Sequence, residues 1–413
     1  MDDGGVDAPG DGNVITPDSS SSCPSGTHTT VSGTVYDPAG RTPLYNVFVY
    51  IPKAPVGSIA TGTTCITCAA VASGSPLASA QTDAKGHFQL VDVPVGTGIP
   101  LVMQLGKWRR TVTISVVSEC SDNPVGQKTG AGIETLTRLP KKQSEGPGDN
   151  IPSIAIATGG CDALECLVRK IGVDDSEFGP GGRIQIYQGA GGASTATSTD
   201  AATTLWPSVS VLSGHDAVLA SSECSSVDRQ GAYAAVKSYV DAGGRFLATG
   251  LHYDWFTSQF ASTAQWKQPV SSTSPPFLVD TTFPKGKALS DWIQSVFTTS
   301  PPPAGQVSVT ETAHDVAGVT APTTRWIYYG DPSTYGTTYL SFNAPVGLKP
   351  SAQCGRAAYS DATVGTGGGI FPTECGNPTD PLTQGEAAAE FLFFDLFSCI
   401  QDDTAPPVTP PQN

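Results

Sequence analysis

Ten cysteines are spread along the 413-residue chain, and their number and spacing constrain the fold more than any other feature. A structural zinc site needs two close pairs of ligands, and the sequence supplies one CxxC pair with no second CxxC or HxxxH after it. A reducing cytosol rarely retains ten scattered thiols without a metal or redox task. The pattern therefore favours five disulfides in an oxidising, extracellular compartment over a metal site. The cysteines are Cys23, Cys65, Cys68, Cys120, Cys161, Cys166, Cys224, Cys354, Cys375 and Cys399.

The charge balance excludes two classes of partner. Asp and Glu number 37 against 22 Lys and Arg, which gives a net charge of −15. Such a field repels phosphate backbones and anionic lipids, and no basic cluster longer than Trp108-Arg109-Arg110 opposes it. No apolar run approaches the ~18 residues of a membrane-spanning helix. We therefore expect no nucleic acid partner and no membrane-spanning segment.

The first 22 residues predict the compartment. They are rich in Asp, Gly and Ser and lack the basic and apolar regions of a signal peptide. We interpret residues 1–22 as a disordered tether of the kind that follows a removed secretory or lipoprotein signal. The predicted location is extracellular or on the outer cell surface, after export through a signal peptide absent from this chain, with a lipid anchor upstream as one option.

Residues 23–140 alternate between short strands and turns rich in Gly, Pro and Asp. Strands at this spacing predict an antiparallel β-sandwich. The clearest strand segments are Thr30–Tyr36, Tyr45–Ile51, His87–Leu90, Pro100–Leu105 and Arg110–Ile114.

Three pieces of this region resemble the carboxypeptidase regulatory-like, or transthyretin-like, β-sandwich found in many secreted proteins. They are V-x-G-T-V-x-D at Val31–Asp37, N-V-x-V at Asn46–Val49 and T-D-x-x-G-x-F at Thr82–Phe88. The resemblance implies a stalk or adhesion module. Four cysteines fall in this region and six in the rest of the chain, so each half can form its disulfides internally.

The pattern changes after residues 141–150, a polar segment with Gly and Pro that we interpret as a linker. Buried apolar strands then alternate with helices, which predicts a flavodoxin-like parallel sheet with helices on both faces over residues 151–400. We expect insertions at about 257–338 and a Pro-rich tail at 401–413. The strands are Ile151–Gly160, Asp216–Ala220 and Arg245–Thr249, and the helices are Asp162–Ile171, Arg229–Ala242 and Glu386–Phe397.

The stretch from D-A-V-L-A at Asp216–Ala220 to V-K-S-Y-V-D-A-G-G-R-F-L-A-T-G-L-H at Val236–His252 resembles the class I glutamine amidotransferase-like fold, particularly its ThuA-like branch. Gly355–Tyr359 resembles the G-R-V-x-Y strand of that branch, but Asp361-Ala362-Thr363 follows where the branch tends to carry a histidine. The order of the two modules is similar to that in myxobacterial secreted surface proteins. The missing histidine argues against an inherited activity.

The residues that follow the predicted strands form the candidate site, because ligands bind at the carboxyl ends of the strands in open parallel sheets. A thiol hydrolase would use Cys224 as nucleophile, His252 as base, and Asp254 or Glu223 as the orienting carboxylate. Amidotransferases place their cysteine in a Gly-x-Cys-x-Gly elbow, which Glu223-Cys224-Ser225 is not. A cysteine among ten in an oxidising compartment is more often half of a disulfide.

Four more residues are candidates for ligand binding. Gly159 and Gly160 end the first strand, Trp255 follows the third, and Asp361 follows the last.

A divalent cation is the alternative chemistry for the strand ends. Glu223, His252, Asp254 and Asp361 offer suitable ligand atoms, but their spacing matches no metal-binding motif, so we expect no cofactor and no metal. A purely structural interpretation is simpler, with His252 hydrogen-bonded to a backbone carbonyl and Asp254 capping a turn.

The leading hypothesis is a secreted or surface-tethered protein that binds or adheres to the cell envelope, with a non-catalytic amidotransferase-like domain. Its partner would be an envelope glycan or a protein surface. The first alternative is a hydrolase acting on glycan or peptide through the cysteine, histidine and carboxylate cluster. The second is a self-assembling structural protein of the surface. The sequence leaves enzymatic activity open, with the balance against it, and it leaves oligomer formation open.

Overall fold

A computed structural model describes residues 23–68, 72–126, 136–266, 276–311, 316–329 and 336–408. The tether predicted at 1–22 and residues 409–413 of the predicted Pro-rich tail lie outside the described residues.

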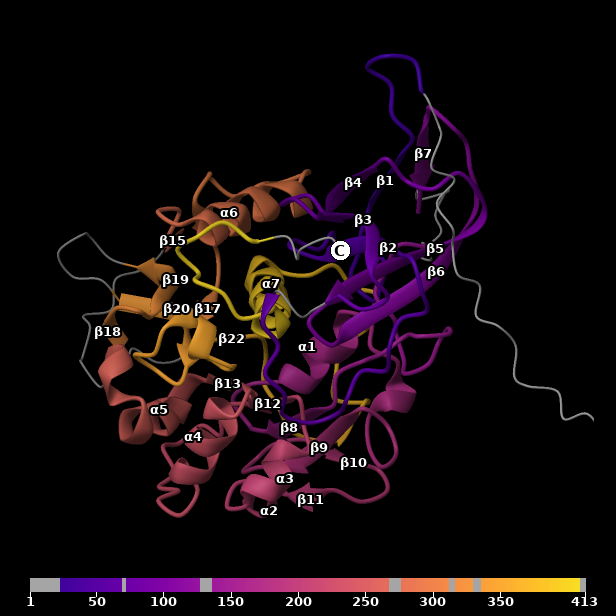
Figure 1. Ribbon diagram of the computed structural model, residues 1–413. Helices are drawn as coiled ribbons and strands as arrows, with labels where there is room; N and C mark the ends of the chain where they lie inside the picture. The colour runs from indigo at the N-terminus through magenta and orange to yellow at the C-terminus, as the bar shows by residue number, and fades with distance from the viewer. Residues whose placement is uncertain are drawn as a thin grey trace, which may run out of the picture.

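A ten-stranded mixed sheet organises the C-terminal two thirds of the chain (Figure 1). Six strands are parallel, and four antiparallel strands extend the sheet beyond β21. In spatial order the strands are β11 (Asp200–Ala201), β9 (Ile184–Gln188), β8 (Ile154–Thr158), β12 (Ala217–Ala220), β13 (Arg245–Thr249), β21 (Gly355–Ser360), β20 (Gly336–Ala344), β19 (Thr324–Tyr329), β15 (Phe277–Val279) and β16 (Gln306–Val307).

The antiparallel half corrects the expectation of a purely parallel, flavodoxin-like sheet. The region expected to be an insertion, 257–338, contributes β15, β16 and β19 and begins β20. Strand β20 is buried at every residue because it lies between β19 and β21. Strands β15 and β16 are three and two residues long, which is too short for hydrophobic periodicity to reveal them.

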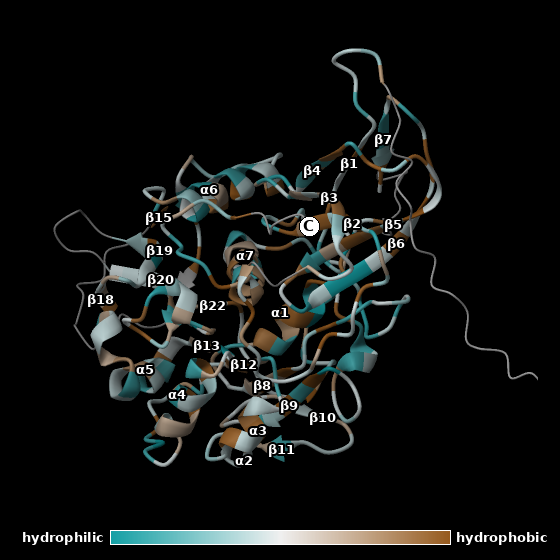
Figure 2. Cartoon of the chain, viewed as in Figure 1, coloured by the Kyte–Doolittle hydropathy of each residue, from teal (hydrophilic) through white to brown (hydrophobic). Residues whose placement is uncertain are grey.

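Helices cover both faces of the parallel half, as the alternating pattern predicts. Ile154 and Ile156 of β8 pack into one apolar cluster with α1 and α7, whereas Ala155 and Ala157 pack into another with α4 and α5. This alternation follows from the two-residue period of a strand. Apolar residues accordingly concentrate on α1 and α7 beside the strands (Figure 2). The helices are α1 (Leu164–Lys170), α2 (Ala202–Leu205), α3 (Val209–Ser213), α4 (Tyr233–Asp241), α5 (Asp254–Gln259), α6 (Pro284–Val296) and α7 (Gln384–Phe397).

Two smaller sheets form the N-terminal part of the chain. One has the order β4-β1-β7 and the other β3-β2-β5-β6, and all pairings are antiparallel except that of β1 with β7, which is parallel. Strand β4 alternates between exposed and buried residues, as expected for a sheet with one wet face. The strands are β1 (Thr30–Thr34), β2 (Phe48–Pro52), β3 (Pro76–Gln81), β4 (His87–Val91), β5 (Gly96–Leu105), β6 (Trp108–Val117) and β7 (Asp122–Val125).

Short pairings complete the described structure. They are β10 (Ser194–Thr195) with β23 (Ile370–Phe371), β14 (Ala264–Trp266) with β18 (Val316–Val319), and β17 (Thr310–Glu311) with β22 (Ala362–Thr363).

The N-terminal sheets and the large sheet share one apolar core. Trp108 of β6 is fully buried, and its ring lies 6.0 to 6.5 Å from the rings of Phe393, Phe394 and Phe397 on α7. Segment 141–150 lies against this junction, since the Asn150 side chain donates to the Lys107 carbonyl at 2.7 Å. The two parts of the chain are therefore packed face to face.

All ten cysteines form disulfides, as their even number predicts. The cysteine counts allowed each half to pair internally, but two bridges join the N-terminal part to the C-terminal part. The loop that carries the CxxC pair lies beside the C-terminal end of α7, where Thr67 forms a β-bridge with Ile400. The bridges are Cys23–Cys120, Cys65–Cys354, Cys68–Cys399, Cys161–Cys224 and Cys166–Cys375.

None of the helices in the described ranges has the length and apolar character needed to cross a bilayer.

Candidate functional site

The carboxyl end of β13 carries the strand–turn–helix geometry on which many α/β enzymes place a nucleophile. Strand β13 ends at Thr249, a tight turn follows over Gly250–Tyr253, and α5 begins at Asp254. Gly250 has φ +53°, a backbone conformation that favours glycine. His252 lies in this turn with φ −79° and ψ 15°, which is not the strained conformation of a nucleophile elbow.

Glu223 is held as a carboxylate in this site. Its Oε2 pairs with the Arg229 guanidinium, and its Oε1 accepts a hydrogen bond from the Ala190 amide at 3.2 Å. The His252 Nε2 atom lies 3.7 Å from Oε2. Burial opposes ionisation of Glu223, but His252 and Arg229 outweigh it and hold the pKa of Glu223 at about 2. A carboxyl with this pKa is a poor proton donor or acceptor near neutral pH.

His252 is 1% exposed, and neither ring nitrogen hydrogen-bonds to any described residue. The expected hydrogen bond from His252 to a backbone carbonyl is thus missing in the described part of the chain. An open hollow of about 460 Å³ does lie near the strand ends, lined by Ser226, Tyr233 and Asp254 among others, but not by His252. Substrate in that hollow would meet hydroxyls and carboxylates rather than the imidazole.

Cys224 cannot act as the nucleophile of the predicted hydrolase. It is exposed, but its Sγ is bonded to Cys161, so no thiolate exists to attack a substrate. The bridge connects the segments that follow β8 and β12, at the edge where the predicted crevice would open. This correction follows from a pairing that the linear sequence left open.

The disulfide pattern makes a direct prediction. We expect denatured but unreduced protein to gain no mass on alkylation, because all ten cysteines are bridged. Intact-mass spectrometry measures this, and protein reduced beforehand serves as the control that gains ten alkyl groups. A label mapped to Cys224 in the unreduced sample would contradict the arrangement and restore a candidate nucleophile.

Asp254 is buried at the start of α5 and accepts a hydrogen bond from the Ser226 hydroxyl. This contact ties the segment after β12 to α5. The structure thus gathers the four predicted catalytic residues around the ends of β12 and β13, but Glu223 pairs with Arg229 and Cys224 is bridged to Cys161.

The predicted ligand-binding glycines are required for close packing. A Cβ atom on Gly159 would lie 2.2 Å from the Ser222 carbonyl oxygen, and one on Gly160 would lie 3.3 Å from the Cys224 sulfur. Because the segments after β8 and β12 approach so closely, the structure gives both glycines a packing role.

Trp255 and Asp361 are buried as well. The Trp255 ring is 1% exposed and packs against Trp206, with ring centroids 4.6 Å apart, while the Arg229 guanidinium lies 5.3 Å from the Trp255 ring centroid. Asp361 is fully buried and accepts a hydrogen bond from the Tyr359 hydroxyl at 2.7 Å. Neither side chain is available on an open surface in this conformation.

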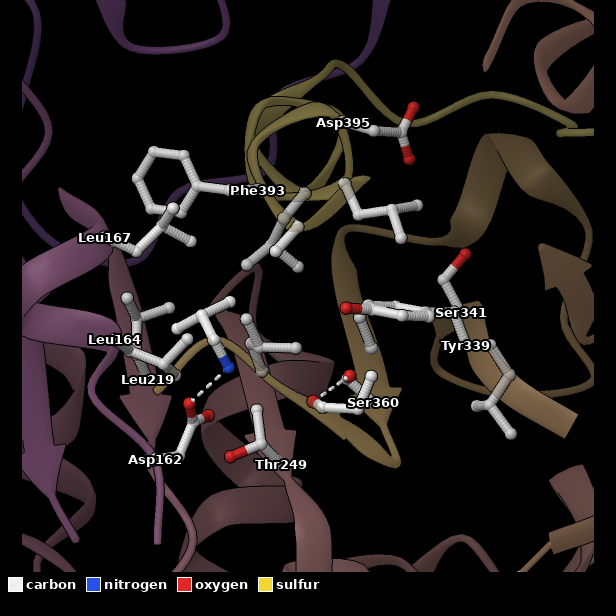
Figure 3. A pocket seen from close by; sticks show the side chains of 18 of the residues that line it. Asp162, Leu164, Leu167, Leu219, Thr249, Tyr339, Ser341, Ser360, Phe393 and Asp395 are labelled. Atoms are coloured by element: carbon white, nitrogen blue, oxygen red, sulfur yellow. Dashed lines mark hydrogen bonds between the residues drawn. The ribbon is translucent and has the colours of Figure 1, made fainter. Parts of the chain in front are cut away.

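Sequence reasoning missed a second group of polar residues, which lies between the sheet and α7 (Figure 3). Asp162 and Thr249 lie at one end of a hollow between the sheet and α7, with Phe393 above them. The hollow has room for about one water molecule, so it is not a substrate pocket. Asp162 Oδ1 accepts hydrogen bonds from the Ala163 and Val364 amides, both at 2.9 Å, while Oδ2 has no partner among the described residues.

Two carboxyl groups at the start of α1 are buried, and neither forms an ion pair with a described residue. Burial raises the pKa of Asp162 to about 6 and that of Glu165 to about 8. Neither oxygen of Glu165 has a hydrogen-bond partner in the described ranges. The Asp-x-x-Glu spacing from Asp162 to Glu165 is the only signal in the sequence, and it matches a helix N-terminus rather than a catalytic pair.

One cluster of the described chain brings three candidate metal ligands together, and it does not support a metal. It consists of Cys166, Glu374 and Cys375. Cys166 and Cys375 are bonded to each other, which removes two thiolates and leaves one carboxylate.

Comparisons with known proteins give no family. No protein-family model matches the sequence, and no curated protein matches it. Among solved structures, a GMP synthase subunit protein from Thermoplasma acidophilum aligns with a TM-score of 0.34 and 11% identity, over 59% of this chain and 92% of that one. A β-galactosidase from Rahnella sp. R3 aligns with a TM-score of 0.31 and 13% identity, over 60% of this chain and 31% of that one.

A third solved structure aligns with a smaller fraction of the chain. A structure of a cohesin–X-dockerin complex from Acetivibrio cellulolyticus aligns with a TM-score of 0.20 and 17% identity, over 38% of this chain and 88% of that one. Similarities at these TM-scores carry no argument about function, which rests on the geometry described above.

Proposed function

We propose that this chain is a secreted or surface-tethered protein that binds the cell envelope, and that its amidotransferase-like crevice is not catalytic. The observation that carries the non-catalytic part of the proposal is the Cys161–Cys224 disulfide between the segments that follow β8 and β12. Ligands of open parallel sheets bind at this edge, and here the cysteine that could attack them is oxidised. The pairing of Glu223 with Arg229 and the burial of His252 support the same conclusion.

In this proposal the sheets β4-β1-β7 and β3-β2-β5-β6 form a carboxypeptidase regulatory-like β-sandwich, and the six parallel strands form the core of the amidotransferase-like domain. The three motifs of the sandwich family fall in or directly beside β1, β2 and β4, which supports the first assignment. Five disulfides are consistent with an extracellular protein. The proposal includes secretion, removal of a signal peptide and a lipid anchor.

We expect the purified protein to attach saturably to cell-envelope fractions and to turn over no member of a glycan or peptide panel. Binding is measured by co-sedimentation at increasing protein concentration, and hydrolysis by mass spectrometry of the panel after incubation. Turnover that His252→Ala abolishes while the circular dichroism spectrum is unchanged would establish the hydrolase instead. Absence of any saturable attachment would overturn the binding proposal.

A further inference from the structure

A large open hollow lies away from the strand ends, where the antiparallel half of the large sheet meets the C-terminal tail. Its cavity volume is about 440 Å³. Segments around Asp280, Pro322, Leu348 and Asp402 line it, so four parts of the chain that are far apart in sequence converge there. Pockets for small ligands commonly span about 300–1,000 Å³, and this hollow falls within that range.

Buried ion pairs hold the walls of the hollow in place. Asp403, in the tail, accepts a hydrogen bond from Lys285 Nζ at 2.8 Å and pairs with Arg356 Nη1 at the same distance. On the opposite wall, Arg325 donates to Asp280 through Nε at 3.0 Å and Nη2 at 2.7 Å. A site built this way binds without first ordering its walls, which reduces the entropic cost of binding.

The cations at the hollow are matched by carboxylates. Arg325 is paired with Asp280, and beneath the floor Lys285 and Arg356 are neutralised by Asp395 and Asp403. Among the described residues, the lining therefore presents no unmatched positive charge to a phosphate, sulfate or carboxylate group. Anionic ligands would lose their hydration without gaining a counter-charge, so they fit the hollow poorly.

One acceptor is left over at the rim. Asp402 is exposed, and its Oδ1 accepts hydrogen bonds from the amide and the hydroxyl of Thr404. Its Oδ2 accepts no hydrogen bond from the described residues. The lining thus carries a carboxylate oxygen that can accept a hydrogen bond from a ligand hydroxyl.

Apolar side chains stand next to these polar groups. Leu348 is 51% exposed, and Phe283, Pro322 and Pro350 complete an apolar wall. A ligand that suits this lining offers hydroxyls at its edges and C–H groups on its faces, which is the chemistry of a sugar ring.

We propose that this hollow binds a short segment of an uncharged oligosaccharide. The inference rests on the proposed envelope binding, to which it adds a binding site and a ligand class. The sugar faces pack on Leu348 and the prolines, and the sugar hydroxyls donate to Asp402.

Isothermal titration calorimetry of the full chain tests the proposal, with uncharged gluco-, manno- and N-acetylglucosamine oligosaccharides as probes and tetralysine as the cationic probe. Leu348→Asp removes an apolar wall and adds a charge that must be desolvated, so we expect at least a tenfold loss of affinity. The matched control is Ile370→Asp on β23, because Ile370 is 50% exposed and does not line the hollow. We expect the control to bind within about twofold of the wild type.

A second variant tests whether misfolding, rather than the change in the lining of the hollow, explains a loss of oligosaccharide affinity. Thr404→Trp fills the hollow from an exposed position and should also abolish binding, with thermal unfolding of both variants compared with that of the wild type. Any of three results would overturn the proposal. They are that the wild type binds none of the oligosaccharides at about 10 mM, that Leu348→Asp binds them with the affinity of the wild type, or that the wild type binds only tetralysine.

The envelope experiment separates this proposal from the function on which it rests. If Leu348→Asp still attaches saturably to envelope fractions and the wild type binds no oligosaccharide, the proposal of a sugar site is wrong and the proposal of envelope binding is retained. Absence of attachment by the wild type would overturn envelope binding, whereas oligosaccharide binding that depends on Leu348 would still establish the hollow as a sugar site.

Discussion

Removal of the two bridges that join the parts of the chain is expected to lower the free energy of unfolding by about 5 kcal/mol or more. The variant replaces both cysteines of Cys65–Cys354 and Cys68–Cys399 by serine, so that no free thiol remains. These bridges span 289 and 331 residues of sequence, the longest loops that disulfides close in this protein. The entropy that a cross-link removes from the unfolded chain grows with loop length.

Equilibrium unfolding in urea without reductant measures the effect. The matched control replaces Cys23 and Cys120 by serine, which opens a loop of 97 residues inside the N-terminal part. We expect the control to lose less than the variant that opens both long loops. A loss below about 1 kcal/mol in that variant would show that the shared core around Trp108, rather than the bridges, holds the parts together.

The free energy of unfolding is expected to decrease as the pH rises from about 5 to above 8. Burial raises the pKa of Glu165 from 4.5 to about 8 in the folded protein, so the folded state favours the protonated form. The stability that this carboxyl contributes is complete below its unfolded pKa and is lost as the pH rises through about 8. At pH 7 the loss is on the order of 3 kcal/mol.

Asp162, Glu390 and Asp37 add to this trend, whereas Glu223, Glu145, Asp403 and His215 oppose it. Burial also raises the pKa of Glu390 well above its usual value, with Asp37 as a second carboxyl beside it, and raises the pKa of Asp37 to about 6. Glu223 acts in the opposite sense, since its pKa of about 2 gives stability that is lost below pH 4.5. Stability should therefore peak between about pH 4 and 6.

Glu165→Gln tests the origin of the pH dependence. The amide cannot ionise, so the variant should lose less stability than the wild type between pH 5 and 8, as measured by urea unfolding at several pH values. Glu119→Gln, at an exposed position, is the matched control and should keep the wild-type slope. A wild-type slope in Glu165→Gln would assign the pH dependence to other carboxyls.

The candidate site was only partly visible in the sequence. The positions after β12 and β13 could be found, because apolar strands followed by polar residues mark the carboxyl edge of a parallel sheet. The pairing of Glu223 with Arg229 could not be found, since Arg229 lies in an irregular segment whose course depends on packing. Glu165 was overlooked because an acid in the first turn of a helix is ordinary, and only its complete burial makes it unusual.

Local patterns in the chain were enough to establish one set of features. The even cysteine count predicted five disulfides, continuous apolar runs located β8, β12 and β13, and a 3.6-residue period located α1, α4 and α7. Two other features became visible only in the folded molecule: which cysteines pair, including Cys224 with Cys161, and the extension of the sheet by β15, β16 and β19. These outcomes depend on contacts between residues up to 331 positions apart, and such contacts are fixed by the packing of whole elements, for which no local period exists.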